Sequence, residues 1–493
     1  MEPSAPTDTA EPSQAPPRPQ ENMRSKTVRG TFYSIVGQGL KNILRLGSNV
    51  ILARLLTRDD FGVSLLVNTV MIGLEMISDL GIETSIIQSK RGEEPTFLDT
   101  AYSIQFVRGV LLFLLACLAA WPAAWYFKAP ELTSLIPLAA TGTLFRGLWP
   151  TKLHLLRRHL EVKKLMIITV GAQALSVVVM AVHAYIYRSV WALVLGSVTV
   201  LATPLLISAF IPGHRNRFKW EATAAKELLS FGQWIFVSTL ITFLADRFAV
   251  LASGRLVDTG TLGVFGMATM LSTLPTAVGG PAVNAVILPA LSEAARTDRS
   301  KLADGFHRAR AVVLPLLLFV TLGLVLWAPA FFGLVYKPEF RDAGWMTQLA
   351  IIGTWFGYQH DAWSRGLLAV GISRPLAVAN AIKLVFTVVL ALGGFYLFEF
   401  PGLILGSCLG AASGYLAISY ALAKAGMSPF KLDAKFGLLA LVLGGVGSQV
   451  PIHLAPLLGL DDYLWLSIVT GLVFLIPAGL FSAKRLKAQL KKK

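Results

Sequence analysis

The chain has 493 residues, of which 54% are hydrophobic and 15% are charged. This composition is too apolar for a soluble protein of that length and is ordinary for a membrane protein that crosses the bilayer several times. The net charge is +16, but the basic residues are scattered between apolar segments, so no nucleic-acid partner is expected.

The chain begins with a proline-rich stretch. Its first 22 residues contain six prolines and almost no large apolar side chain. This composition is typical of a disordered tail, which we expect over residues 1–24 on the cytoplasmic side. No apolar core follows a basic start, so no cleaved signal peptide is expected.

Fourteen apolar segments follow, most of them about 20–28 residues long, the length that a membrane-spanning helix needs. They cover residues 30–56, 61–88, 99–127, 132–153, 165–187, 191–211, 228–256, 261–291, 309–336, 345–370, 375–398, 402–423, 436–453 and 463–481. We therefore predict an all-α, polytopic membrane protein. Its expected parts are six-helix bundles at 25–215 and 216–425, two additional spans at 426–485 and a basic cytoplasmic tail at 486–493.

The loops between these segments differ in charge. When the Lys and Arg residues are assigned to alternating sides, 30 of the 44 fall with the two termini and seven fall on the opposite side. Because basic loops stay in the cytoplasm, both termini are predicted to be cytoplasmic. The remaining seven lie inside the spans.

Those seven embedded cations are Lys41, Arg45, Arg108, Arg146, Arg247, Arg365 and Lys383. One charge at the centre of a spanning helix costs about 2.5–3.5 kcal/mol on insertion scales, so seven facing lipid would cost on the order of 20 kcal/mol. Most should instead line a hydrated interior that attracts anions. We predict that all seven bind substrate, with Arg108 and Arg146 favoured because no carboxylate is near them in the sequence.

Two polar stripes lie on consecutive predicted spans. The first carries Gln38, Lys41, Asn42, Arg45 and Asn49, and the second carries Asn68, Glu75, Asp79 and Glu83. At 100° per residue each set lies on one helix face. The stripes either pair with each other or leave Lys41 or Arg45 free to bind a phosphate in the cavity.

The embedded acids allow two readings. Glu75, Asp79 and Asp246 are candidates for carrying a coupled proton or sodium ion, and simple pairing with cations is the alternative. Asp361 and Arg365, four residues apart, are expected to neutralise each other. Trp234, Trp355, Tyr358 and Trp363 either stack on sugars or serve ordinary packing.

A short repeat relates the two halves. At an offset of 201 residues, Arg, Leu, Gly and Val at positions 54, 55, 62 and 63 match positions 255, 256, 263 and 264. Both copies fall on an external hairpin after an odd-numbered span, so the repeat is parallel. Halves related in this way are typical of secondary transporters.

The same residues carry a family likeness. Residues 51–62, 78–82 and 86–90, with Asp246, 254–256, 262–265 and 288–292, resemble the hairpins of bacterial polysaccharide flippases, a branch of the multidrug/oligosaccharidyl-lipid/polysaccharide exporter superfamily. The resemblance implies two bundles around a V-shaped cavity and alternating access in the bacterial inner membrane. It implies that a polyprenyl-diphosphate-linked oligosaccharide moves to the periplasmic leaflet for surface polysaccharide assembly. The partners expected on this basis are that lipid-linked cargo, membrane lipids, a polysaccharide polymerase and a co-polymerase.

Other features limit the alternatives. The two cysteines imply neither a disulfide nor a metal site, and no phosphate-binding GxxxxGK[ST] loop is present, so no cofactor is expected. The eighth span holds Pro275, Gly279, Gly280, Pro281 and Pro289, so it should be kinked, either as a static bend or as the flexing element. A cation-coupled drug exporter and a membrane oligosaccharide ligase are the alternative functions. The ligase would need a large external loop, and we expect no enzyme.

Overall fold

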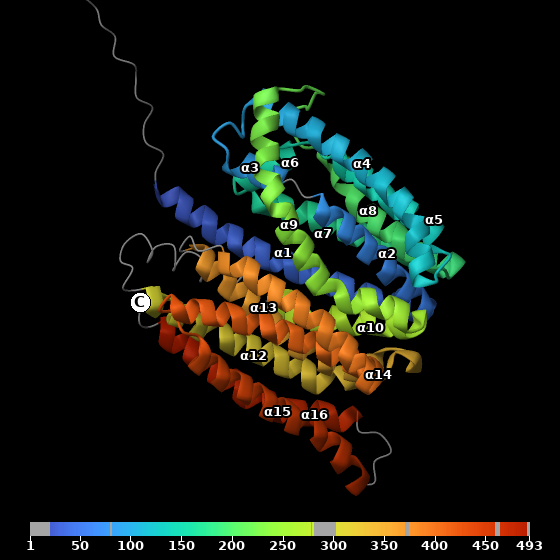
Figure 1. Ribbon diagram of the computed structural model, residues 1–493, viewed down its shortest axis with the longest axis vertical. Coiled ribbons are helices and arrows are strands. Elements are labelled where there is room, and N and C mark those ends of the chain that lie inside the picture. The colour runs from blue at the N-terminus through green and yellow to red at the C-terminus, as the bar shows by residue number, and fades with distance from the viewer. Residues whose placement is uncertain are drawn as a thin grey trace, which may run out of the picture.

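The computed structural model describes residues 20–78, 81–277, 279–280, 302–369, 374–458 and 464–490, where every regular element is a helix (Figure 1). The prediction of an all-α fold is confirmed for this part of the chain. The first half forms α1 (Gln20–Leu55), α2 (Arg58–Ile77), α3 (Ile82–Gln88), α4 (Pro95–Phe127), α5 (Leu132–Gly147), α6 (Lys152–Arg158), α7 (Val162–Tyr187) and α8 (Trp191–Ser208). The second half forms α9 (Ala222–Leu256), α10 (Thr259–Ser272), α12 (Leu302–Val335), the 3-10 helix η2 (Pro338–Phe340), α13 (Ala343–Ala369), α14 (Arg374–Lys424), α15 (Phe430–Leu457) and α16 (Leu464–Leu490).

Figure 1 shows α2–α8 grouped on one side of α1 and α12–α16 grouped on the other, with α9 crossing between the groups. Among the described residues, six helices are long and apolar enough to cross a membrane: α4, α7, α8, α12, α14 and α15. The count of fourteen spans and the domain boundaries stay predictions.

Two predicted spans are each divided into two helices. The segment 61–88 forms α2 and α3, separated at Gly81, whose φ of 63° is left-handed. The segment 132–153 forms α5, which ends at Gly147, and then runs into the first residues of α6, a separate short helix. Arg158 of α6 holds α3 in place by donating hydrogen bonds to the Ile86, Ile87 and Ser89 carbonyl oxygens at 2.7, 3.1 and 2.7 Å. The proline kink expected beyond Gly280 lies outside the described residues.

α14 is a helical hairpin that contains two predicted spans. Its backbone leaves the helical conformation at Phe398 and Glu399. Its two arms pack through a stripe of small residues, because a Cβ at Gly402, Gly406 or Gly410 would lie only 2.0–2.1 Å from an atom of the opposite arm. Small residues at four-residue spacing allow such close backbone contact within a membrane.

The two halves meet where α1 turns into α2 and α9 turns into α10, which we call the hairpin end. Both turns end in an N-cap at positions separated by 201 residues: Thr57 accepts from the Asp60 amide, and Asp258 accepts from the Thr261 amide at 2.8 Å. The offset seen in the sequence therefore relates two equivalent turns.

From these caps α2 and α10 pack directly on each other. A Cβ at Gly62 would lie 1.9 Å from the Thr259 carbonyl oxygen, and one at Gly263 would lie 1.9 Å from the Arg58 carbonyl oxygen. Phe61 also meets Phe340 edge to face, with ring centroids 5.7 Å apart. The hairpin end is thus closed by contacts between the two halves.

The first two predicted spans pack mainly against other helices and not against each other. α1 lies along α7, while α2 packs against α10 and α9. The two polar stripes still share one cleft, which Asn49 of α1 and Asn68 of α2 both line.

Candidate functional site

The polar stripe of α1 carries two cations without a counter-charge. Within the described part of the chain, neither Lys41 nor Arg45 makes a side-chain ion pair, and the charges that act on Lys41 are those of Arg45 and Arg157. Arg157 does have a carboxylate partner, Glu83. Lys41 and Arg45 thus form a row of two uncompensated positive charges on α1, near the paired Arg157, which an anion would neutralise.

Arg45 lies at a cleft of about 250 Å³ that both halves build. Its neutral polar lining includes Ser48, Asn49, Ser64, Asn68, Gln173 and Ser176, and Gly263 and Met270 of α10 form the opposite wall. Ser48 and Ser176 donate to the carbonyl oxygens of Arg45 and Gly196 at 2.9 and 2.8 Å, so their lone pairs stay available as acceptors. The cleft can therefore bind both an anion and hydroxyl groups.

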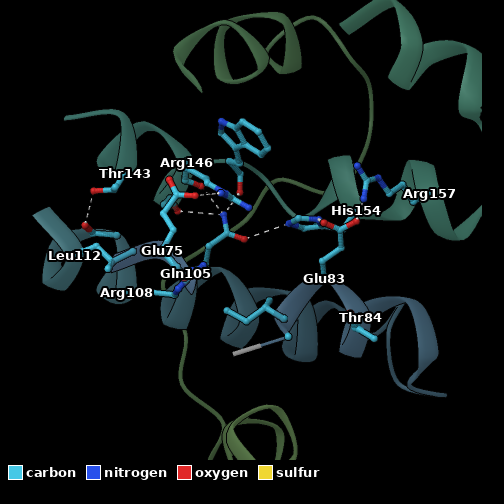
Figure 2. A pocket seen from close by; sticks show the side chains of 15 residues that line it. Glu75, Glu83, Thr84, Gln105, Arg108, Leu112, Thr143, Arg146, His154 and Arg157 are labelled. Atoms are coloured by element: carbon cyan, nitrogen blue, oxygen red, sulfur yellow. Dashed lines mark hydrogen bonds and ion pairs between the residues drawn. The ribbon is translucent and has the colours of Figure 1, made fainter. Parts of the chain in front are cut away.

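A second cavity, of about 330 Å³, lies within the first half (Figure 2). The ends of α2 and α5 meet here through Glu75 and Arg146, whose Oε2 and Nη1 atoms are 2.7 Å apart. Arg108 of α4 donates to the Ser78 hydroxyl and to the Glu75 carbonyl, both at 3.1 Å. Glu75 thus pairs with α5 and not with the cations of α1, so the hypothesis that the two stripes pair with each other is not met there.

Gln105, 7% exposed, organises the floor of this cavity. Its amide nitrogen donates to the carbonyl oxygens of Arg146 and Trp149 at 2.8 and 3.1 Å, which anchors the end of α5. Its Oε1 atom lies 3.2 Å from Nε2 of His154 on α6. Figure 2 shows Gln105 between Arg146 and His154.

His154 is buried beside Glu83, with 3.9 Å between its Nδ1 atom and the carboxylate oxygen. Burial lowers the pKa of His154 to about 4, and the nearby charges of Arg157 and Arg146 act in the same direction, while Glu83 opposes them. His154 is therefore neutral near pH 7. Gln105 on α4 and His154 and Arg157 on α6 were missed in the sequence because only the fold brings them together.

In the second half, Lys383 of α14 pairs with Asp246 of α9 at 2.5 Å. The aliphatic part of the Lys383 side chain packs against Gly414, where an added Cβ would lie 2.8 Å from the Lys383 Cβ. Asp246, named above as an ion-coupling candidate, is therefore engaged with a cation. Arg247, next to it, is partly buried on α9.

Among the described residues, Asp361 forms an ion pair with the adjacent His360, at 3.3 Å. The positive charges of Lys383 and Arg365 also act on the Asp361 carboxylate. Asp79 lies outside the described residues. Substrate binding by the seven cations and ion coupling by the acids stay predictions.

Three of the four aromatic candidates are core residues. Trp363, Trp355 and Tyr358 are 0%, 5% and 4% exposed and belong to one apolar cluster, so the packing reading holds for them. The side chain of Trp234 lies outside the described residues.

Trp363 also helps to bury a charge. It donates to Asp433 at 3.3 Å, as Tyr415 does at 2.8 Å. The same carboxylate pairs with Arg310, which is fully buried and lies 5.0 Å from the Trp363 ring centroid. This cluster attaches α15 to α12.

Known proteins resemble the chain. The lipopolysaccharide biosynthesis protein WzxC of Escherichia coli (strain K12) is 24% identical over 331 residues, 65% of this chain and 65% of that protein. The teichuronic acid biosynthesis protein TuaB of Bacillus subtilis (strain 168) is 22% identical over 57% of this chain and 58% of that protein. The succinoglycan biosynthesis transport protein ExoT of Rhizobium meliloti (strain 1021) is 24% identical over 72% of this chain and 68% of that protein. The chain thus covers less than two-thirds of the length of WzxC and TuaB.

Solved structures share the fold. The lipid II flippase MurJ in an inward closed conformation superposes with a TM-score of 0.69 at 15% identity, over 92% of this chain and 99% of that chain. A multidrug resistance MATE family transporter in an inward-facing conformation superposes with a TM-score of 0.63 at 15% identity, over 79% of this chain and 94% of that chain. The chain shares the fold of these two proteins. The family model for "Polysaccharide biosynthesis protein" matches residues 51–343, more than half of the chain, which therefore belongs to that family of membrane proteins.

Proposed function

We propose that the protein is a flippase for a polyprenyl-diphosphate-linked oligosaccharide used in surface polysaccharide assembly. One observation carries this proposal: Lys41 and Arg45 lie on one face of α1, close to Arg157, without a carboxylate partner of their own among the described residues. A diphosphate supplies the negative charge that this row lacks.

The cargo explains why such a row is needed. A diphosphate and its sugars cannot cross hydrocarbon unaided, because each unsatisfied polar group costs several kcal/mol. Fixed cations and hydroxyl acceptors in the Arg45 cleft replace the lost hydration. The polyprenyl chain stays in lipid while the head group passes.

The geometry favours alternating access. Gly263 and Met270 of α10 form part of the cleft that contains Arg45, and α10 also closes the hairpin end against α2. Separation of α2 from α10 would open the hairpin end and, in the same movement, separate the walls of the Arg45 cleft. The cargo would then lose its binding site as that end opens, and it would be released there.

The charge of the loops supports an orientation. We place both termini in the cytoplasm and the hairpin end in the periplasm, with the chain in the bacterial inner membrane. The flipped lipid would then be available to a polymerase and its co-polymerase.

For the coupling ion we favour a proton at Glu75. Its carboxylate is paired with Arg146, so protonation would break a contact between α2 and α5, whereas a sodium ion would have to displace a guanidinium. The comparison of a pH gradient with a sodium gradient in the same vesicles tests this choice.

The proposal is tested by reconstituting the protein in liposomes and measuring translocation of a polyprenyl-diphosphate-linked sugar. Lys41→Ala and Arg45→Ala should each slow translocation by about tenfold, the loss of about 1.4 kcal/mol of binding. Lys164→Ala is the matched control, because Lys164 forms an exposed pair with Glu161. Normal translocation in both cation variants, or transport of a cationic drug in place of the lipid, would overturn the proposal and favour a drug exporter.

A further inference from the structure

The cavity between α2, α3, α4, α5 and α6 shares no lining residue with the Arg45 cleft. Arg157 lines this cavity, and its charge acts on Lys41. We infer that this cavity is a subsite for one neutral sugar residue of the cargo, recognised through its hydroxyl groups between Glu83 and His154. The inference rests on the proposed function, because the diphosphate at Lys41 would bring the attached sugar to the mouth of the cavity.

The tautomer of His154 follows from its neighbour. Gln105 donates its amide hydrogens to the carbonyl oxygens of Arg146, Gly147 and Trp149, so its nitrogen and oxygen are assigned without ambiguity. The Oε1 atom is therefore the acceptor that faces His154, and Nε2 of the imidazole must carry the proton. The Nδ1 atom is left as an acceptor.

That acceptor faces another acceptor. The Nδ1 atom of His154 lies 3.9 Å from a carboxylate oxygen of Glu83, and neither atom can donate to the other. A hydroxyl group placed at this gap would donate to one of them, and a pair of neighbouring hydroxyls would donate to both. The arrangement thus selects a ligand rich in hydroxyl donors.

The gap between Glu83 and His154 favours a neutral ligand. Of the three arginines that line the cavity, Arg146 and Arg157 pair with Glu75 and Glu83. The third, Arg108, donates to the Ser78 hydroxyl and to the Glu75 carbonyl. A sugar carboxylate would meet Glu83 and the lone pair of His154 and be repelled. The cavity volume of about 330 Å³ has room for a monosaccharide.

The chain offers a matched pair of substitutions. In Glu83→Gln the new amide would donate to Nδ1 of His154 and fill the gap that the sugar hydroxyl needs. Glu93→Gln is the control. Glu93 also contacts an arginine and a histidine, Arg158 and His159, but it does not line the cavity. Glu75→Gln, which removes another acceptor of the cavity, serves as a second variant if Glu83→Gln does not fold.

The test measures binding to the purified full-length protein in lipid nanodiscs. The probes are a short polyprenyl diphosphate and the same lipid carrying one glucose or one glucuronic acid. We expect Glu83→Gln to weaken binding of the glucose lipid about tenfold relative to the sugar-free lipid. The comparison is relative because this substitution also frees Arg157, whose charge acts on Lys41. Glu93→Gln should change the binding of neither lipid. Wild-type protein should bind the glucose lipid more tightly than the glucuronic acid lipid.

An equal change in the binding of the glucose and sugar-free lipids in Glu83→Gln, or no change in either, would overturn the subsite. Tighter binding of the glucuronic acid lipid would overturn its neutral character. Failure of the proposed function looks different: the sugar-free lipid would then bind Lys41→Ala and Arg45→Ala as tightly as the wild-type protein.

Discussion

Gly62 and Gly263 occupy equivalent places in the two halves and bring the backbones of α2 and α10 into direct contact. Each glycine lies against the carbonyl oxygen found four residues before the other one, at Thr259 and Arg58. The contact is therefore symmetric, although it is formed within one chain.

This symmetry predicts the effect of adding one methyl group. Gly62→Ala or Gly263→Ala should push α2 and α10 apart, because a Cβ at 1.9 Å from a carbonyl oxygen cannot be accommodated. A disulfide between Asp59→Cys and Thr259→Cys, whose native side chains are hydrogen-bonded, reports closure in a variant lacking Cys117 and Cys408. Each alanine should reduce the rate of this cross-link about tenfold, or about 1.4 kcal/mol.

Gly47→Ala is the control for this experiment, since a Cβ at Gly47 meets no atom within 4 Å. Undiminished cross-linking in both alanine variants would show that the hairpin end is not closed by this contact.

The pair of Asp246 and Lys383 predicts an asymmetric response to mutation. The Lys383 side chain is 9% exposed and that of Asp246 is 48% exposed. Asp246→Asn leaves a buried ammonium unpaired and should destabilise the protein by about 3 kcal/mol, whereas Lys383→Met leaves a hydrated carboxylate and should cost about 1 kcal/mol. Thermal unfolding in detergent measures both, and a larger loss for Lys383→Met would contradict the prediction.

His154 predicts a pH dependence of stability. Its pKa is about 4 in the folded protein and 6.5 in the unfolded chain, so the unfolded chain binds more protons between these values. The free energy of unfolding should therefore be fully retained above pH 6.5 and fall by up to ~3 kcal/mol as the pH drops toward 4. In His154→Gln this part of the pH dependence should disappear from thermal unfolding curves, and identical pH profiles for the two proteins would refute it.

Arg310 predicts how α15 is attached. Arg310→Met leaves the Asp433 carboxylate buried without its cation and should destabilise the protein by about 3–5 kcal/mol. Arg310→Met with Asp433→Leu should recover most of this loss, because both charges are then absent. The exposed pair of Arg91 and Glu94 is the control, and Arg91→Met should cost less than about 1 kcal/mol. A double variant as unstable as the single one would disprove the role of the pair.

Several features of the fold follow from local patterns in the sequence. The apolar segments give the helices, and Thr57 and Asp258 cap α2 and α10 where the repeat places them. The break at Phe398 and Glu399 lies where the sequence separates the spans 375–398 and 402–423. The break at Gly81 is harder to predict, because the apolar segment 61–88 continues through it.

The site was predicted less completely than the helices. Lys41 and Arg45 share a helix face in the sequence, and the structure keeps them together without an acid. The pairing of Arg146 with Glu75 was not predicted, since 71 residues separate them. Which cation meets which carboxylate depends on which helices pack together, and α1 packs on α7 and not on α2.

The sequence by itself determined the membrane-spanning character, the helical class and the two equivalent hairpins, because hydropathy, capping and small-residue spacing act over a few turns of chain. Only the tertiary structure decided that α2 and α10 close one end, that Gln105 sets the tautomer of His154, and that Lys383 is buried against Asp246. These features depend on distances between side chains from different helices, which no local pattern encodes.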